Sequence, residues 1–312
     1  MIVIKKYLKY LGSLVTIISI AFVIYAVFKL KIDFEKLANP RAILILLVGA
    51  LGVTFTVYFL AYAWKNTLDY LSGRSNRFKD VAHVYGKANI GKYLPGNVMH
   101  YVERNLFATK IGLSQLDLAI SSVIEVVGII IVALLFSVIC AHEALLKAAK
   151  QYIKPQYLII LGVLALIAIA VIIFIYLKSE KIRSMVKRLL NWKFVLVFII
   201  NLIIYAIVLA ILGAILVLVC GFIFEVDLQA REVGAIITYY MLAWVLGFVV
   251  PGAPGGIGVR EAILVLLLSP VIGDSVTLSA ALIHRLISII GDFIGYVIAL
   301  LLKNSDDETK SR

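Results

Sequence analysis

Long runs of hydrophobic residues alternate with short polar segments along the whole chain. A helix needs about 20 mostly apolar residues to cross a hydrocarbon core of about 30 Å, and six runs approach or exceed that length. These runs lie at 11–28, 42–63, 116–139, 157–177, 194–222 and 278–302. The pattern predicts an all-α polytopic membrane protein with about six spanning helices.

Two further apolar segments, at about 82–110 and 234–272, are each interrupted by glycine and proline. The interruptions share one spacing: Gly91-Lys-Tyr-Leu-Pro95-Gly96 precedes Arg104, and Gly247-Phe-Val-Val-Pro251-Gly252 precedes Arg260. Proline lacks an amide donor and glycine gives up backbone restraint, so neither propagates a helix. At membrane depth the freed backbone groups are tolerated only beside protein or a water-filled cavity.

We therefore expect two re-entrant hairpins whose tips meet near the bilayer midplane. The tip residues are Pro95, Gly96, Asn97, Pro251, Gly252, Pro254, Gly255, Gly256 and Gly258. The second hairpin should return in a half-helix over 262–268 that stops at Ser269-Pro270 and whose N-terminus could cradle an anion. Two alternatives stay open: the first segment could lie on the cytoplasmic membrane surface, and the second could be an external loop.

The order of the predicted elements repeats. Each half of the chain, 1–150 and 151–312, reads helix, helix, break, helix, and the two proline breaks lie 156 residues apart. Three crossings in each half would invert the second half relative to the first, as in many secondary transporters. The chain is expected to form a single transmembrane domain built as an inverted repeat.

Composition supports a membrane environment, and charge adds an orientation. Hydrophobic residues make up 63% of the chain and charged residues 15%, against about 45–50% and about 25% in soluble domains. The net charge of +12 is unevenly spread: with the N-terminus inside, sixteen lysines and arginines lie in cytoplasmic segments and eight in external ones. The positive-inside rule then predicts that both termini are cytoplasmic. Because the positive charge is explained by this orientation, we expect a cell (inner or plasma) membrane protein with no nucleic-acid partner.

Ionisable residues inside the apolar runs are candidates for a site, because each is costly in hydrocarbon. They are Glu125 in the third run and His284, Arg285 and Asp292 in the last. Arg285 and Asp292 share one helix face with Ser288. Two interpretations remain open: a structural ion pair of Arg285 with Asp292 or Glu125, and a functional site.

Enzyme chemistry has little support in the sequence. The four histidines lack the paired spacing of a metal site, and no phosphate loop or nucleophile elbow is present. We expect no cofactor, no metal and no enzymatic activity, with a membrane-embedded phosphatase or glycosyl transferase as the alternative. Cys140 and Cys220 are expected to be apolar core thiols, with a disulfide as the alternative.

The segment from Pro251 to Ala262, together with Tyr93-Leu-Pro-Gly-Asn97 and Arg104, resembles the flippase-like membrane domain of lysylphosphatidylglycerol synthases. The resemblance covers nearly the whole chain. It implies translocation of a lipid, and not lipid synthesis, because the aminoacyl transfer domain of the synthases has no counterpart up to residue 312. It assigns the site to Pro95, Gly96, Arg104, Pro251, Gly252, Gly255, Gly256, Arg260 and Glu261.

The leading hypothesis is a translocase for a phospholipid or polyprenyl-phosphate-type lipid with an anionic or zwitterionic headgroup. Arginine forks match phosphate oxygens, so Arg104 and Arg260 should meet the phosphate. The full headgroup-binding set is Arg104, Arg260, Glu261, Glu103 and Arg285. The acids would balance the arginines, or bind a cationic headgroup or a coupling proton.

Two other functions are compatible with the same sequence features. The alternatives are a membrane subunit or scaffold for a separate lipid- or glycan-modifying transferase, and a small-solute transporter. The expected partners besides lipid are a second copy of the chain or a separate biosynthetic enzyme.

Overall fold

A computed structural model of the protein describes residues 39–94, 98–109, 112–140, 177–249, 254–256 and 258–302. All secondary structure in these ranges is helical. The predicted spans at 11–28 and, except for residue 177, at 157–177 lie outside the described residues. The same holds for the tip residues Pro95, Gly96, Asn97, Pro251 and Gly252.

Among the described residues, four helices are long and apolar enough to cross a membrane. They are α2 (Pro40–Ser72), α5 (Gln115–Cys140), α9 (Trp192–Leu218), which the π-helical turn η4 (Val219–Ile223) extends, and α12 (Asp274–Leu301). Each contains or closely matches one of the predicted runs. The chain is therefore an all-α, multi-pass membrane protein.

Asparagine side chains cap the N-termini of α2 and α9. The side chain of Asn39 accepts the amide of Arg41 at the start of α2, and Asn191 accepts the amide of Lys193 at the start of α9. Asparagine at this position satisfies one of the amides that a helix start leaves free. A short helix, α8 (Glu180–Leu189), precedes α9.

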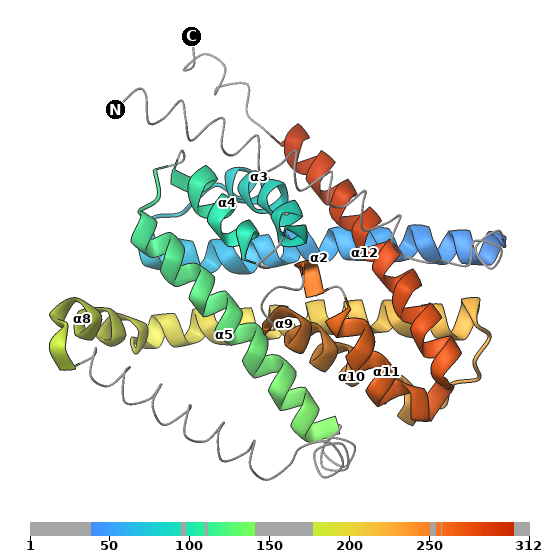
Figure 1. Ribbon diagram of the computed structural model, residues 1–312. Coiled ribbons are helices and arrows are strands. Elements are labelled where there is room, and N and C mark those ends of the chain that lie inside the picture. The colour runs from blue at the N-terminus through green and yellow to red at the C-terminus, as the bar shows by residue number, and fades with distance from the viewer. Residues whose placement is uncertain are drawn as a thin grey trace.

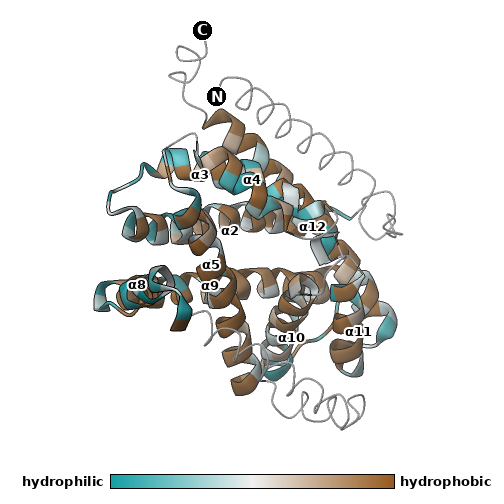
Figure 2. Ribbon diagram, turned by 60° about the vertical axis from the view of Figure 1, so that its left-hand side comes forward, coloured by the Kyte–Doolittle hydropathy of each residue, from teal (hydrophilic) through white to brown (hydrophobic). Residues whose placement is uncertain are grey.

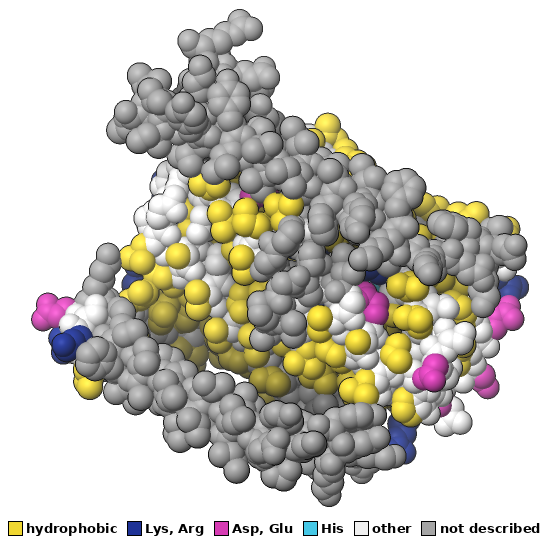
Figure 3. Space-filling model, viewed as in Figure 1, with side chains coloured by type: hydrophobic (Ala, Val, Ile, Leu, Met, Phe, Trp, Pro, Cys, Tyr) yellow, Lys and Arg dark blue, Asp and Glu magenta, His cyan; other side chains and the backbone are white. Residues whose placement is uncertain are grey.

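The outer surface of the long helices is apolar. Leu44 is 59% exposed, Val138 65% and Ile139 71%. Figure 2 shows hydrophobic residues along the length of these helices, and hydrophobic side chains dominate the described part of the face in Figure 3. A surface of this kind suits a lipid environment, because soluble proteins rarely expose contiguous apolar patches larger than a few hundred Å².

Two helix–break–helix units accompany the spans. The first comprises α3 (Phe78–Asn89), η2 (Ile90–Tyr93) and α4 (Met99–Ala108). The second comprises α10 (Ala230–Val249), η5 (Pro254–Gly256) and α11 (Val259–Ile272). Figures 1 and 2 place the first unit beside α2 and the second beside α9, on opposite sides of this helix pair, with η5 in orange reaching toward the first unit in Figure 1. Their re-entry into the membrane stays a prediction.

The half-helix of the second unit is longer than predicted. It was expected to stop at Ser269-Pro270, but α11 runs for 14 residues and contains Pro270 in its last turn. Proline there removes a single backbone hydrogen bond. The helix ends at Gly273, whose amide donates to the Ser269 carbonyl (2.8 Å) and whose φ of +85° suits glycine.

The contacts between helices occur in corresponding pairs. The second helices of the two halves, α2 and α9, pack antiparallel: Asn201, early in α9, donates to the Ala63 carbonyl late in α2 (3.0 Å). In Figure 1, α2 and α9 run side by side. As α3 packs on α12, so α10 packs on α5, and η2 contacts η5. The predicted inverted repeat stays a prediction, because the first helix of each half lies outside the described residues.

Helix α12 approaches α2 closely at a glycine. Thr54 donates its hydroxyl to the Gly291 carbonyl (2.8 Å), and one turn along Tyr58 donates to the Gly295 carbonyl (2.6 Å). A Cβ on Gly291 would lie 2.6 Å from the Ala50 carbonyl oxygen, whereas a Cβ on Gly295 would meet Val57 at an ordinary 3.8 Å. Small residues at such positions permit close helix packing in membranes.

We expect Gly291→Ala to lower the free energy of unfolding by about 1–3 kcal/mol, because the added methyl group meets backbone that must move. Gly295→Ala is the matched control and should stay within about 0.5 kcal/mol of the unsubstituted protein. Thermal unfolding in detergent measures both. Equal losses in the two variants would contradict the close contact at Gly291.

Candidate functional site

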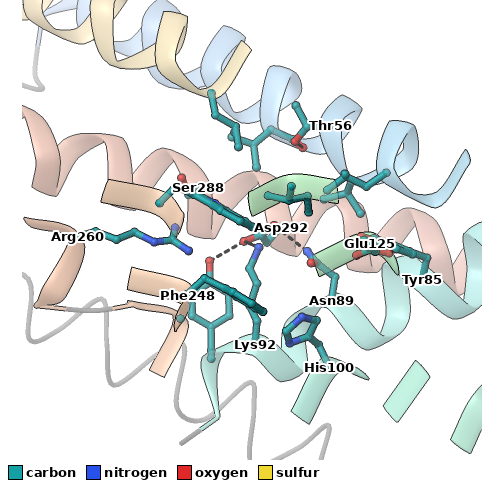
Figure 4. A pocket seen from close by; sticks show the side chains of 18 of the residues that line it. Thr56, Tyr85, Asn89, Lys92, His100, Glu125, Phe248, Arg260, Ser288 and Asp292 are labelled. Atoms are coloured by element: carbon teal, nitrogen blue, oxygen red, sulfur yellow. Dashed lines mark hydrogen bonds and ion pairs between the residues drawn. The ribbon is translucent and has the colours of Figure 1, made fainter. Parts of the chain in front are cut away.

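A cavity of ≈ 80 Å³ lies between the two breaks. Residues from α2, both helix–break–helix units, α5, α9 and α12 line it. Its charged and histidine lining residues are Lys92, His100, Glu125, Arg260, Arg285 and Asp292. Figure 4 shows several of these side chains pointing toward a common centre. Four of the predicted ionisable residues, Glu125, Arg260, Arg285 and Asp292, and the predicted tip residue Gly255 thus line one site.

The buried carboxylate of Asp292 joins α12 to the first break. Asn89 donates to Oδ1 (2.8 Å), and the Tyr93 hydroxyl (2.6 Å) and Lys92 Nζ (2.7 Å) contact Oδ2. Asp292 is 1% exposed, so these three donors replace its solvation. Figure 4 shows the interactions as dashed lines. Asp292 pairs with Lys92, and Glu125 pairs with Arg104, so among the described residues neither acid forms the ion pair with Arg285 that the sequence left open as one of two interpretations.

Arg285 instead contacts the second break. Its NH2 group donates to the Gly255 carbonyl (2.7 Å). A Cβ on Gly255 would lie 2.9 Å from that NH2 group and 3.3 Å from the Tyr93 ring, and its φ of +55° also favours glycine. The two breaks therefore meet at Gly255 and Tyr93, close to the predicted tips.

Arg260 extends into the cavity from the start of α11, as Figure 4 shows. Its guanidinium lies over the Trp244 ring (5.1 Å to the centroid), a cation–π contact. Nε is buried and has no hydrogen-bond partner among the described residues, and no described carboxylate forms an ion pair with Arg260. A Cβ on Gly247 or Gly256 would lie 2.4 or 2.8 Å from this side chain. Both glycines make room for Arg260.

Arg104 occupies a different environment from Arg260, although the sequence pattern makes them equivalent. It is 1% exposed, does not line the cavity, and donates from NH1 to Glu125 Oε2 (2.8 Å). Its guanidinium lies 4.6–4.8 Å from the ring centroids of Trp64, Tyr85 and Tyr101. The predicted meeting of Arg104 and Arg260 at one phosphate is therefore wrong, because aromatic rings and Glu125 enclose Arg104.

The other two predicted acids, Glu261 and Glu103, contact backbone near the two breaks. Glu261 accepts the Gly258 amide at the start of α11 (2.6 Å), so a protein carboxylate occupies the helix N-terminus that was predicted to cradle an anion. Glu103 is 1% exposed and packs on Gly91, where a Cβ would lie 2.8 Å from Oε2. Neither acid lines the cavity. Pro254 and Gly256 lie in η5 and Gly258 directly precedes α11, and their place at the tip of a re-entrant hairpin stays a prediction.

The remaining predicted residues are His284 and the two cysteines. His284 Nε2 donates to the Leu212 carbonyl (2.9 Å), which ties α12 to α9. Cys220 is buried as expected, whereas Cys140 is exposed, and both are free thiols.

Sequence reasoning missed Lys92 as a site residue. The lysine stands inside the first break motif, three residues before Pro95. The cost of an ionisable group in an apolar segment, which identified Glu125, applies equally to Lys92. Asn89, Tyr93 and Trp244 were also missed, since polar and aromatic residues are common in membrane helices.

The chain matches the family described as lysylphosphatidylglycerol synthase TM region over residues 14–295. It therefore belongs to this family, as the resemblance of its break motifs predicted. The match includes both breaks, the spans α2, α5 and α9, and α12 up to residue 295. A comparison with curated proteins finds no match.

Proposed function

We propose that the protein translocates a lipid with a phosphate-containing headgroup between the two leaflets. The observation that carries the proposal is the cavity between the two breaks, into which Arg260 extends without a carboxylate partner among the described residues. An arginine fork forms paired, charge-assisted hydrogen bonds with phosphate oxygens. In transporters built from inverted repeats, substrate sites lie at the interface of the repeats, near broken helices.

The headgroup would pass through the cavity while the acyl or prenyl chains stay in the bilayer. Several side chains on the long helices are apolar and exposed, which suits contact with lipid chains. Membership of the lysylphosphatidylglycerol synthase TM region family supports a lipid as the substrate. We also propose the absence of enzymatic activity, a cell-membrane location and cytoplasmic termini, on the sequence arguments given above.

Reconstitution into vesicles tests this function. A phospholipid with a fluorescent acyl chain is placed in both leaflets, and a membrane-impermeant quencher reports which molecules reach the outer leaflet. The exchange is measured with and without a proton gradient. The wild-type protein should accelerate it relative to protein-free vesicles under at least one of the two conditions. No acceleration under either condition would reject translocation of that lipid.

Arg260→Ala should slow the exchange by about tenfold or more, the effect of losing a hydrogen bond to a charged group. Arg183→Ala is the control, because Arg183 is a partly exposed arginine on α8 whose ion pair with Glu180 is long, at 3.8 Å. The control should exchange lipid at the wild-type rate. Unchanged exchange by Arg260→Ala would remove the phosphate role of Arg260.

A further inference from the structure

Lys92 is the more exposed member of the ion pair that joins the first break to α12. Its side chain is 29% exposed, whereas that of Asp292 is 1% exposed, and both residues line the cavity. Figure 4 shows the Arg260 side chain extending toward this pair. An ammonium group carries three N–H donors, and Asp292 contacts it from one side (2.7 Å). Lys92 can therefore donate to a ligand in the cavity without leaving Asp292.

Three cations line the same cavity, and they come from both breaks and from α12. They are Lys92 in η2, Arg260 at the start of α11 and Arg285 in α12. Arg260 and Arg285 lie near enough to repel the Lys92 ammonium, and Arg285 also repels Arg260. Of the two acids among the described lining residues, Asp292 pairs with Lys92, whereas Glu125 pairs with an arginine outside the cavity. An anion lying between the three cations would relieve their repulsion.

We propose that Lys92 is a second contact for the headgroup phosphate, so that one phosphate lies between Lys92 of the first break and Arg260 of the second. This inference rests on the proposed function and adds a binding residue from the other half of the chain. Hydrogen bonds from charged donors to phosphate oxygens are shorter and stronger than those between neutral groups. Because the two donors belong to different breaks, a bound phosphate also holds the breaks together.

Binding of a short-chain phosphatidylglycerol to the purified protein in detergent tests this contact. A ligand that binds only the folded state raises the unfolding temperature, and the concentration dependence of the rise gives a dissociation constant. Dihexanoylphosphatidylglycerol is compared with dihexanoylglycerol, which has the same acyl chains and no phosphate. The difference between the two ligands measures the contribution of the phosphate.

Lys92→Met should weaken binding of the phosphatidylglycerol about tenfold, the effect of losing a hydrogen bond to a charged group. Lys92→Arg keeps the charge and should restore most of the affinity. Lys65→Met is the matched control, because Lys65 also pairs with an aspartate, Asp69, but does not line the cavity. The control should bind as the wild type does. Unchanged binding in Lys92→Met would overturn the contact.

Asp292→Asn separates a contact with the ligand from a structural effect of the broken ion pair. Lys92→Met and Asp292→Asn both remove the pair, but only Asp292→Asn leaves the ammonium in place and removes a negative charge that repels the phosphate. Asp292→Asn should therefore bind the phosphatidylglycerol more tightly than the wild type. Equal weakening in the two variants would assign the effect to the lost ion pair and overturn the inference.

Hydrogen exchange in the wild-type protein tests the bridge between the breaks without any substitution. Dihexanoylphosphatidylglycerol should slow exchange at 90–93 as well as at 259–261, relative to dihexanoylglycerol. Protection at 259–261 alone would overturn the Lys92 contact and leave the role of Arg260 and the proposed translocation standing. Protection at neither site, with equal unfolding temperatures for the two ligands, would overturn the phosphate recognition on which both proposals depend.

Two soluble ions distinguish a lipid headgroup from a free phosphate. Inorganic phosphate and glycerol 3-phosphate should raise the unfolding temperature less than the phosphatidylglycerol at the same concentration, because they lack acyl chains that bury apolar surface. An equal rise would assign the site to soluble phosphate and overturn the lipid as its source.

Discussion

Replacing Arg104 by alanine is expected to lower the free energy of unfolding by about 3–5 kcal/mol, because it leaves a buried charge without its partner. Glu125 is 3% exposed and would lose the donor on Oε2. The rings of Trp64, Tyr85 and Tyr101 would lose the cation that they enclose. Thermal unfolding in detergent measures the loss.

A double variant separates charge from packing. Arg104→Met with Glu125→Leu replaces the buried pair by apolar groups of similar size, which is often close to neutral. It should recover most of the stability lost in Arg104→Ala. Arg183→Ala removes an exposed pair and should change stability by no more than about 1 kcal/mol. A double variant as unstable as the single one would assign the loss to packing and not to the stranded carboxylate.

Asp292→Ala should release the first break from α12. Three donors, Asn89, Tyr93 and Lys92, lose their acceptor at once. Loss of one member of a buried ion pair costs about 3–5 kcal/mol, and the effects of the other two donors do not simply add to it. Unfolding should therefore occur at a lower temperature.

Hydrogen exchange locates the effect of Asp292→Ala. Amides of 90–93 should exchange faster relative to those of α9, because local opening follows the loss of local contacts. Ser288→Ala is the control: Ser288 lines the same cavity, but its hydroxyl donates to the His284 carbonyl of its own helix (2.9 Å). A uniform increase of exchange over the whole protein would argue against a tether between Asp292 and the first break.

The spans followed from hydropathy with small errors at their ends. The predicted run 116–139 compares with Gln115–Cys140, and 194–222 compares with Trp192–Ile223. A long apolar run is a local property that tertiary contacts rarely reverse in a membrane. The end of α11 was predicted less well, because proline in a last turn is tolerated where glycine ends the helix.

The ionisable residues of the site were predicted better than their partners. Glu125, Arg285 and Asp292 were recognised because a charge inside an apolar run needs compensation. Helical spacing places Arg285 and Asp292 on one face, but it does not say which segment packs against that face. Lys92 is the partner of Asp292 because η2 packs on α12, and Arg104 is the partner of Glu125 because α4 packs on α5.

The amino-acid sequence by itself determined a helical membrane protein with two matching breaks and costly charges near them. These features depend on local composition and on the need to satisfy backbone and charge in hydrocarbon. Only the tertiary structure decided that Tyr93 and Lys92 bind Asp292, that aromatic rings and Glu125 enclose Arg104, and that Arg260 extends into the cavity. Tyr93 and Asp292 are 199 residues apart, and which of several buried charges meet depends on how whole helices pack.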